Sequence, residues 1–296
     1  MSCKLSHFTG STFVKGVGIF TALSKSSKSE LDNIYDSSNW VVFVDPKVDL
    51  SFFTKDESKD NDLIIIHYSD QYTTTSGYDE ITVTRKSKQY ETIIKELLQE
   101  KGVSANRDNI NGIINLFNAI NGRWMLHLMS VKKLSGAADN NFSREKMSIL
   151  SAIKLCLAYY ENKHITWIPI SLEEMLRVSR GAGLSQDEGI LSAKNLGFDH
   201  GPASDDILLV GIENVQDTIN VYLHPVEVKI GNNLSGVISK AKVQVLNTHD
   251  KLLQALWPKE NRDSLESKLS RNFIMQLVIV CCEKMKLYKI YPNETW

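Results

Sequence analysis

The segment that constrains the fold most is SDDILLVGIENVQDTINVYLHPVEVKIG, at residues 204–231. Two apolar runs of strand-like composition flank the polar stretch ENVQDT, which indicates a β-hairpin. Because side chains alternate between the faces of a strand, we expect Glu227 and Lys229 side by side on one face. A tight turn at Gln216–Asp217 would place Asp206 directly opposite Glu227. A bulge in the turn would change this pairing.

Two carboxylates and an ammonium group at one place are suited to hydrolysis. The oxygens of Asp206 and Glu227, with the main-chain carbonyl of Val228, form a hard ligand set of the kind that binds Mg²⁺. Lys229 could orient a water molecule or offset charge on a phosphate, while the metal activates the water and stabilises the leaving oxygen. The pattern therefore predicts phosphodiester hydrolysis. A plainer interpretation stays open, in which these residues form a solvated ion pair worth under about 1 kcal/mol, and Asp205 is a rival ligand.

Composition restricts the alternatives. The chain has 296 residues and a net charge of −1, so any contact with nucleic acid must be local or shared with a partner. The four cysteines lack the spacing of a zinc site. The longest apolar stretch, IMQLVIVCC at 274–282, is too short to cross a bilayer, and the first residues do not read as a signal peptide. We therefore expect a cytoplasmic protein with no membrane partner.

The order of apolar patterns indicates an α/β protein with two domains. Residues 1–134 alternate between strands and helices and are expected to form an α/β accessory domain. A small, polar stretch at 134–143 is the candidate linker, and residues 140–296 form the second domain. The elements expected there are a helix at 144–161, a strand at 164–170, the hairpin, and helices at about 235–257 and 262–286.

The hairpin resembles a known nuclease signature. Asp206 ahead of ILLV, followed by VEVK at 226–229, is similar to the bipartite motif of the PD-(D/E)xK nucleases. For the second domain this resemblance implies a restriction-endonuclease-like fold, with a mixed central sheet flanked by helices. The chain departs from the family in lacking the motif's proline. It also continues into a second helix where the family has a further strand.

The resemblance also implies roles for residues outside the hairpin. Glu145, at the start of the helix before the hairpin, would join Asp206, Glu227 and the Val228 carbonyl as a metal ligand for Mg²⁺ or Mn²⁺. Glu173 and Glu174 are weaker rivals for that place. In the helix after the motif, Lys240 and Gln244 would contact the DNA backbone, and their spacing of four places them on one helix face.

A longer stretch is similar to one restriction family. The run ITWIPISLEEMLRVSRGAGLSQDEGILSAKNLGF at 165–198, leading into SDDILLVGI and HPVEVKIG, resembles the DptH (DndH) proteins of bacterial phosphorothioate modification systems. The resemblance implies a longer cytoplasmic protein with a HerA/FtsK-like ATPase and two partner subunits, which cleaves DNA lacking the phosphorothioate mark. GSTFVKGVG and RGAGLSQDEG both fail the GxxxxGK[ST] pattern, so we expect no ATP site in these residues.

The sequence thus predicts a divalent-metal-dependent endonuclease that acts on double-stranded DNA beside other subunits of a restriction complex. The alternative is a catalytically inactive nuclease-like module that binds DNA or docks subunits. Near-neutral charge slightly favours this alternative, because autonomous DNA binding generally requires a basic surface.

Overall fold

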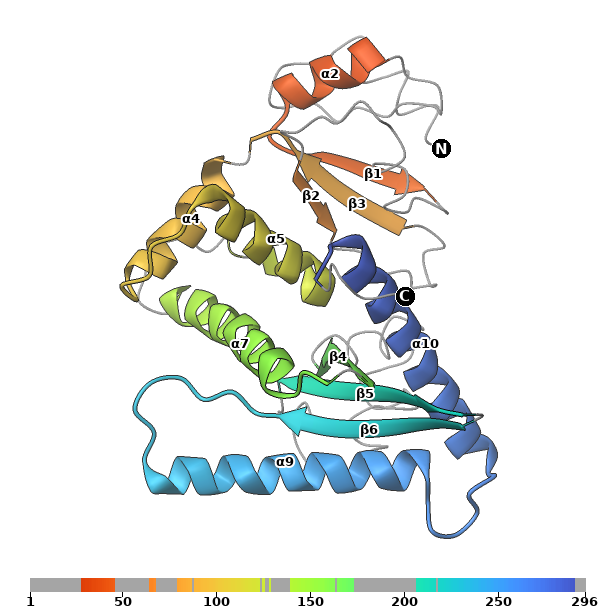
Figure 1. Ribbon diagram of the computed structural model, residues 1–296. Coiled ribbons are helices and arrows are strands. Elements are labelled where there is room, and N and C mark those ends of the chain that lie inside the picture. The colour runs from red at the N-terminus through yellow and green to blue at the C-terminus, as the bar shows by residue number, and fades with distance from the viewer. Residues whose placement is uncertain are drawn as a thin grey trace.

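The computed structural model describes residues 28–45, 64–67, 79–86, 88–122, 124–125, 128, 139–162, 164–172, 206–216 and 218–290. Within them the chain forms helices around two three-stranded sheets, so the expected mixture of helix and strand is confirmed (Figure 1). In chain order the elements are α2 (Lys28–Ser37), β1 (Val41–Asp45), β2 (Ile64–His67), β3 (Asp79–Thr84), α4 (Lys88–Gln99), α5 (Arg107–Asn121), α7 (Asp139–Tyr159), β4 (Ile165–Ser171), β5 (Ile207–Val215), β6 (Thr218–Val226), α9 (Ser235–Leu256) and α10 (Leu265–Leu287).

The sheets have the strand orders β1-β3-β2 and β4-β5-β6. Every strand pair that the structure describes is antiparallel, whereas the nuclease resemblance implies a mixed sheet. A mixed sheet would need a parallel neighbour reached through a long crossover. The described part of the second sheet is instead a hairpin with one further antiparallel strand.

The first sheet is built on β3, which lies between its two neighbours. Ile81 and Val83 are fully buried there, and with Tyr35 of α2 they form a small core. Tyr288, just after α10, packs into the same core. The C-terminal helix therefore links the first sheet to the rest of the molecule.

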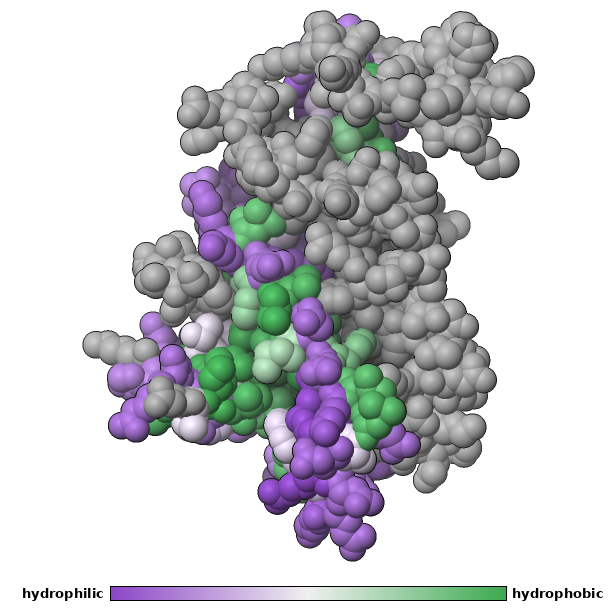
Figure 2. Space-filling view, turned by 90° about the vertical axis from the view of Figure 1, so that its right-hand side faces the viewer, coloured by the Kyte–Doolittle hydropathy of each residue, from purple (hydrophilic) through white to green (hydrophobic). Residues whose placement is uncertain are grey.

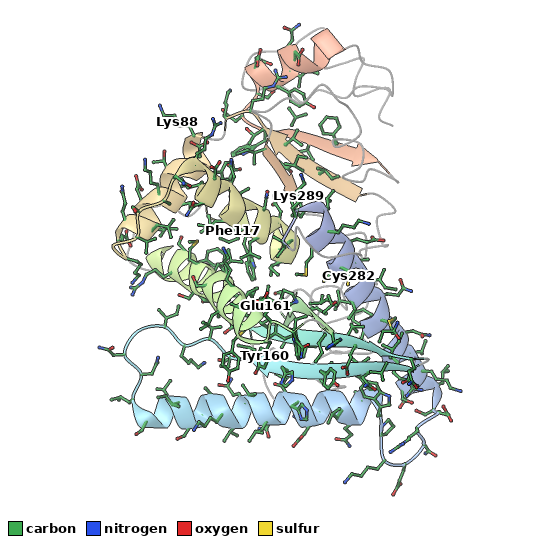
Figure 3. All side chains as sticks on the ribbon, in the orientation of Figure 1. Lys88, Phe117, Tyr160, Glu161, Cys282 and Lys289 are labelled. Atoms are coloured by element: carbon green, nitrogen blue, oxygen red, sulfur yellow. The ribbon has the colours of Figure 1, made fainter. Side chains whose placement is uncertain are left out.

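The main core lies between α4, α5 and α7 and one face of the second sheet. The α5 helix is capped by Asn106, whose side chain accepts a hydrogen bond of 2.8 Å from the backbone N–H of Asn109. Its apolar residues recur at helical spacing, and Phe117 is fully buried between α5 and α7 (Figure 3). Trp124, Met125 and Leu128 are buried in the same core.

The central strand β5 is buried on both faces. Ile207 and Leu209 join the core beneath α7, whereas Leu208 and Val210 pack with α9 and α10 on the opposite face. Such a strand reads as a continuous apolar run because neither face meets water. Figure 1 shows the resulting layers, with α7 above the sheet and α9 below it.

The expected linker is wrong in its second half. Asp139–Ser143 form the first turns of α7, and Ser143 is buried. Small polar residues favour a loop only weakly, and burial against neighbouring elements overrides that preference here. The main core also contains residues from both sides of this segment. The two-domain division stays a prediction.

Candidate functional site

The register of the hairpin places the sequence motif. The β5–β6 ladder runs from Val215↔Thr218 to Ile207↔Val226, which is the register that a tight turn predicts. Gln216, in the turn, has a φ of 55°, in the left-handed region that such turns require. Asp206 lies one residue before Ile207 and Glu227 one residue after Val226, so the ladder brings both to the same end of the sheet. The backbone N–H of Asp206 donates to the Val226 carbonyl over 3.2 Å.

Asp206 is held by backbone groups on both sides. Its side-chain Oδ2 accepts a hydrogen bond of 2.8 Å from the N–H of Val228, and its carbonyl accepts one of 3.3 Å from Leu172. Burial raises the pKa of Asp206, and the hydrogen bond from Val228 opposes that effect. Asp206 is thus a partly buried carboxyl group whose position is fixed by the end of the hairpin.

Glu227 and Lys229 form an ion pair between Oε1 and Nζ, which confirms that they lie side by side. The β6 strand ends at Val226, so the pair lies in the segment just beyond the ladder. Only 4% of the Glu227 side chain is exposed, against 34% for Lys229. The interpretation as a solvated ion pair therefore does not fit Glu227. A carboxylate this buried requires a partner charge or hydrogen bonds.

The second turn of α7 contributes charges to the same region. The helix begins at Asp139, so the expectation that Glu145 lies at its start is wrong. The charge of Glu145 raises the pKa of Asp206, and the charge of Lys146 lowers it. Lys229 also lowers the pKa of Asp206. The helix and the end of the hairpin therefore bring these charged side chains within electrostatic range of one another. The role of Glu145 as a metal ligand stays a prediction.

Lys146 is a residue that the sequence reasoning missed. Its side chain is only 7% exposed, and its Nζ lies 2.9 Å from Oε1 of Glu145. The same ammonium group stands 4.6 Å from the centre of the Trp124 ring and 5.4 Å from that of Phe142. A signal was present, because Lys146 shares the helical spacing of the buried Ile149 and Ile153.

Lys240 and Gln244 lie on α9, the helix predicted for them. Lys240 is exposed and Gln244 is half-buried, so Lys240 in particular is accessible to a ligand. Their role in DNA binding stays a prediction. The rivals Asp205, Glu173 and Glu174 lie outside the described residues.

The donor set has the chemistry of a Mg²⁺ or Mn²⁺ site but is not gathered as one. Carboxylate oxygens from Glu145, Asp206 and Glu227 are the ligands that these hard ions prefer. Among the described residues, however, no group of three His, Cys, Asp or Glu side chains is close enough to hold an ion. Glu145 and Glu227 each pair with a lysine instead, and each would have to leave that lysine before it could bind an ion.

His224 has a packing role. It stacks on Tyr160 with ring centres 5.4 Å apart and contacts the Trp167 ring at 5.2 Å. Burial lowers the pKa of His224, which favours the neutral ring. Tyr222 packs against Trp167, and its hydroxyl donates to Glu213 over 2.7 Å.

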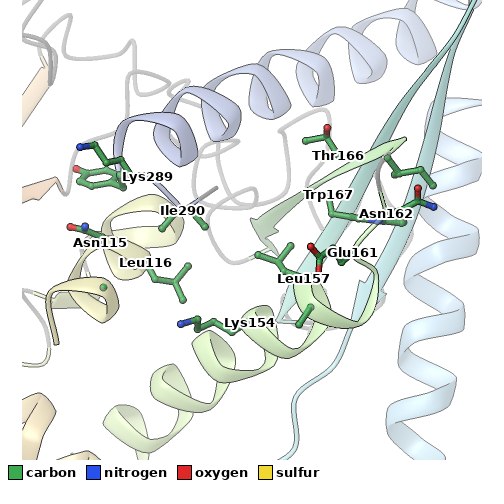
Figure 4. Close-up of a pocket in the computed structure, with 14 residues that line it drawn as sticks. Asn115, Leu116, Lys154, Leu157, Glu161, Asn162, Thr166, Trp167, Lys289 and Ile290 are labelled. Carbon is green, nitrogen blue, oxygen red and sulfur yellow. The ribbon is translucent and has the colours of Figure 1, made fainter. Parts of the chain in front are cut away.

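A separate cavity of about 420 Å³ lies toward the other end of α7, between α5, α7, β4 and the end of α10 (Figure 4). Its volume suits a small ligand. Lys154 and Glu161 contribute opposite charges, and Leu116, Leu157 and Ile290 provide an apolar wall. This mixed lining favours no single class of ligand.

None of the helices described is long and apolar enough to cross a membrane. No family model matches the chain, and neither a curated protein nor a solved structure matches it.

Proposed function

We propose that this chain carries the nuclease site of a restriction system and hydrolyses DNA phosphodiester bonds with Mg²⁺ or Mn²⁺. The observation that supports this most is the hairpin register. It puts Asp206 next to the Glu227–Lys229 pair at one end of the sheet, with Glu145 close enough to act on the pKa of Asp206. Two carboxylates beside a lysine are groups that metal-dependent hydrolysis can use.

Each residue of the site has a separate role in this proposal. Asp206 and Glu227 would hold the metal from the two strands of one hairpin, with Glu145 and the Val228 carbonyl completing its ligands. The bound ion would activate water and stabilise the leaving oxygen. Lys229, once separated from Glu227, would orient the water and offset the charge of the phosphate. Lys240 and Gln244 would steady the DNA backbone from α9.

The biological setting is proposed from the resemblance to the DptH family. We infer a bacterial defence role in which double-stranded DNA lacking phosphorothioate is cut together with partner subunits. The ATPase of such a system would lie outside these residues. A cytoplasmic location follows from that setting.

A second candidate is a nuclease-like module that binds DNA or docks subunits without cutting. The lysine partners favour it, since Glu227 is paired with Lys229 and Glu145 with Lys146. A buried carboxylate that keeps its lysine stabilises the hairpin and is not available to an ion.

Plasmid nicking distinguishes the two. The chain would be incubated with unmodified supercoiled plasmid and Mg²⁺ or Mn²⁺, beside Glu227→Ala and Lys229→Ala. Glu213→Ala is the matched control, because Glu213 belongs to the same hairpin but lies toward its turn. Metal binding would be followed in parallel by calorimetry.

Nicking that needs metal and that disappears in both site variants, but not in the control, supports the endonuclease. Absence of both nicking and metal binding refutes it and favours the non-cutting module. Metal binding that Glu227→Ala abolishes, without nicking, would mean that the partner subunits complete the enzyme.

A further inference from the structure

The α10 helix is apolar on two faces, and one of them is exposed. Its inner face carries Ile274, Leu277, Val278, Cys281 and Met285, which pack into the core below the second sheet. With 100° per residue, a second apolar stripe lies on the opposite side of the helix. That stripe consists of Leu265, Leu269, Met275 and Ile279, whose exposed fractions range from 41% to 73%. Figure 2 shows hydrophobic side chains reaching the surface on this side of the molecule.

The stripe has a symmetric spacing about Asn272. Leu269 and Met275 each lie three residues from Asn272, and Leu265 and Ile279 each lie seven residues from it. An antiparallel copy of the same helix, turned about an axis through Asn272, would therefore place Leu265 opposite Ile279 and Leu269 opposite Met275. Isologous two-fold interfaces require this kind of self-complementary surface.

We propose that the outer face of α10 binds the same face of a second copy of this chain, antiparallel about Asn272. The proposal goes beyond the nuclease function and does not depend on it. A partner of different sequence would have no need of a symmetric stripe, which is why a second copy is the occupant that this surface favours.

The polar residues of this face agree with such a pairing. Asn272 is exposed and would meet its symmetry mate on the axis, where each amide can both donate and accept a hydrogen bond. One such asparagine within an apolar helix interface fixes the register of the pair. The same symmetry places Lys268 opposite Gln276, so no like charges face each other there.

The interface should be weak. The stripe extends roughly 21 Å along the helix, and a single helix pair of that length buries less than the roughly 800 Å² per partner of a standard stable complex. We therefore expect a dimer whose population depends on protein concentration.

A cysteine at the axis tests the geometry directly. Asn272→Cys should form a disulfide between two copies under mild oxidation, because two helices packed 8–10 Å apart bring residues on the axis within disulfide range. Gln254→Cys, on the exposed side of α9, is the matched control. The unmodified chain reports on any cross-linking by its own cysteines.

Sedimentation velocity over a roughly hundredfold concentration range gives the second measurement. Leu265→Glu should reduce the dimer at least tenfold, since Leu265 is 73% exposed at the helix start and its replacement leaves the core intact. Leu246→Glu, at a position 62% exposed on α9, should leave the dimer unchanged. Asn272→Cys that cross-links no faster than Gln254→Cys would overturn the proposal. A chain that stays monomeric throughout, or a dimer indifferent to Leu265→Glu, would also overturn it.

Discussion

Replacing Gly211 by alanine should destabilise the fold by about 2–3 kcal/mol, because the central strand β5 has no room for a methyl group at this position. A Cβ atom there would lie 2.7 Å from Cζ3 and 2.9 Å from Cη2 of Trp167, and 3.0 Å from Cγ2 of Ile165. The indole cannot easily move away. Its ring centre is 5.1 Å from that of Tyr160 and 5.2 Å from that of His224. The loss of stability should therefore lie in the upper part of the range of about 1–3 kcal/mol that overpacking a core usually costs.

Urea denaturation would measure this loss, with Gly112→Ala as the matched control. Gly112 lies inside α5, and its added Cβ would have no neighbour within 4 Å. Alanine there should stabilise the protein by about 0.5–1 kcal/mol through its better helix propensity. The two glycine replacements should thus have opposite signs.

The contact itself can be tested with Trp167→Phe, which removes the two indole atoms that the new methyl group would meet. Gly211→Ala should then cost at least about 1 kcal/mol less in the Trp167→Phe background than in the unmodified chain. If Gly211→Ala lowers stability equally in both backgrounds, or does not lower it at all, then β5 does not approach the indole as closely as described.

Three further changes probe the site and its support. Burial raises the pKa of Asp206 in the folded state above its value in the unfolded chain. The free energy of unfolding should therefore fall as the pH rises from the ordinary aspartate range through the raised pKa, because ionised Asp206 is less favourable in the folded state. Asp206→Asn keeps an acceptor for the Val228 N–H and should remove this fall, so an unchanged pH profile in urea denaturation would contradict the assignment. Lys146→Ala should lower the free energy of unfolding by about 1 kcal/mol more than Lys146→Met, since methionine keeps the apolar stem beside Trp124. Equal losses of stability in the two variants would exclude that packing role. Asn106→Ala should lower the thermal stability by about 1 kcal/mol through the lost α5 cap, whereas Asn106→Asp should retain it.

The hairpin could be predicted from sequence because two independent signals agree on it. Two apolar runs around a polar stretch indicate the strands, and a tight turn specifies the register that pairs Ile207 with Val226. The end of the ladder could not be predicted in the same way. The alternation of apolar and polar residues continues through Val228 in the sequence. The strand nevertheless stops at Val226, because its pairing with the neighbouring strand β5 ends at Asp206.

The helix before the hairpin shows the opposite case. Its start was missed because Asp139–Ser143 have loop-like composition, and only the packing of Phe142 and Ser143 explains why they are helical. Lys146 was missed for a related reason. A lysine within an amphipathic helix is normally read as part of the polar face, and its burial depends on Trp124, which comes from an earlier part of the chain.

The burial of β5 on both faces also determines how the candidate site can move. A strand enclosed in this way exchanges its amide hydrogens only when the whole cooperative unit unfolds, so Leu208–Val210 should be among the slowest residues to exchange. Asp206 is joined to that unit through hydrogen bonds to Val226 and Leu172. Any rearrangement that frees the carboxylates must then occur at the periphery, in the segment after Val226 or the first turns of α7. The slow-exchanging strand would then hold Asp206 in place, and motion of the faster-exchanging segments around it would control whether the carboxylates are accessible.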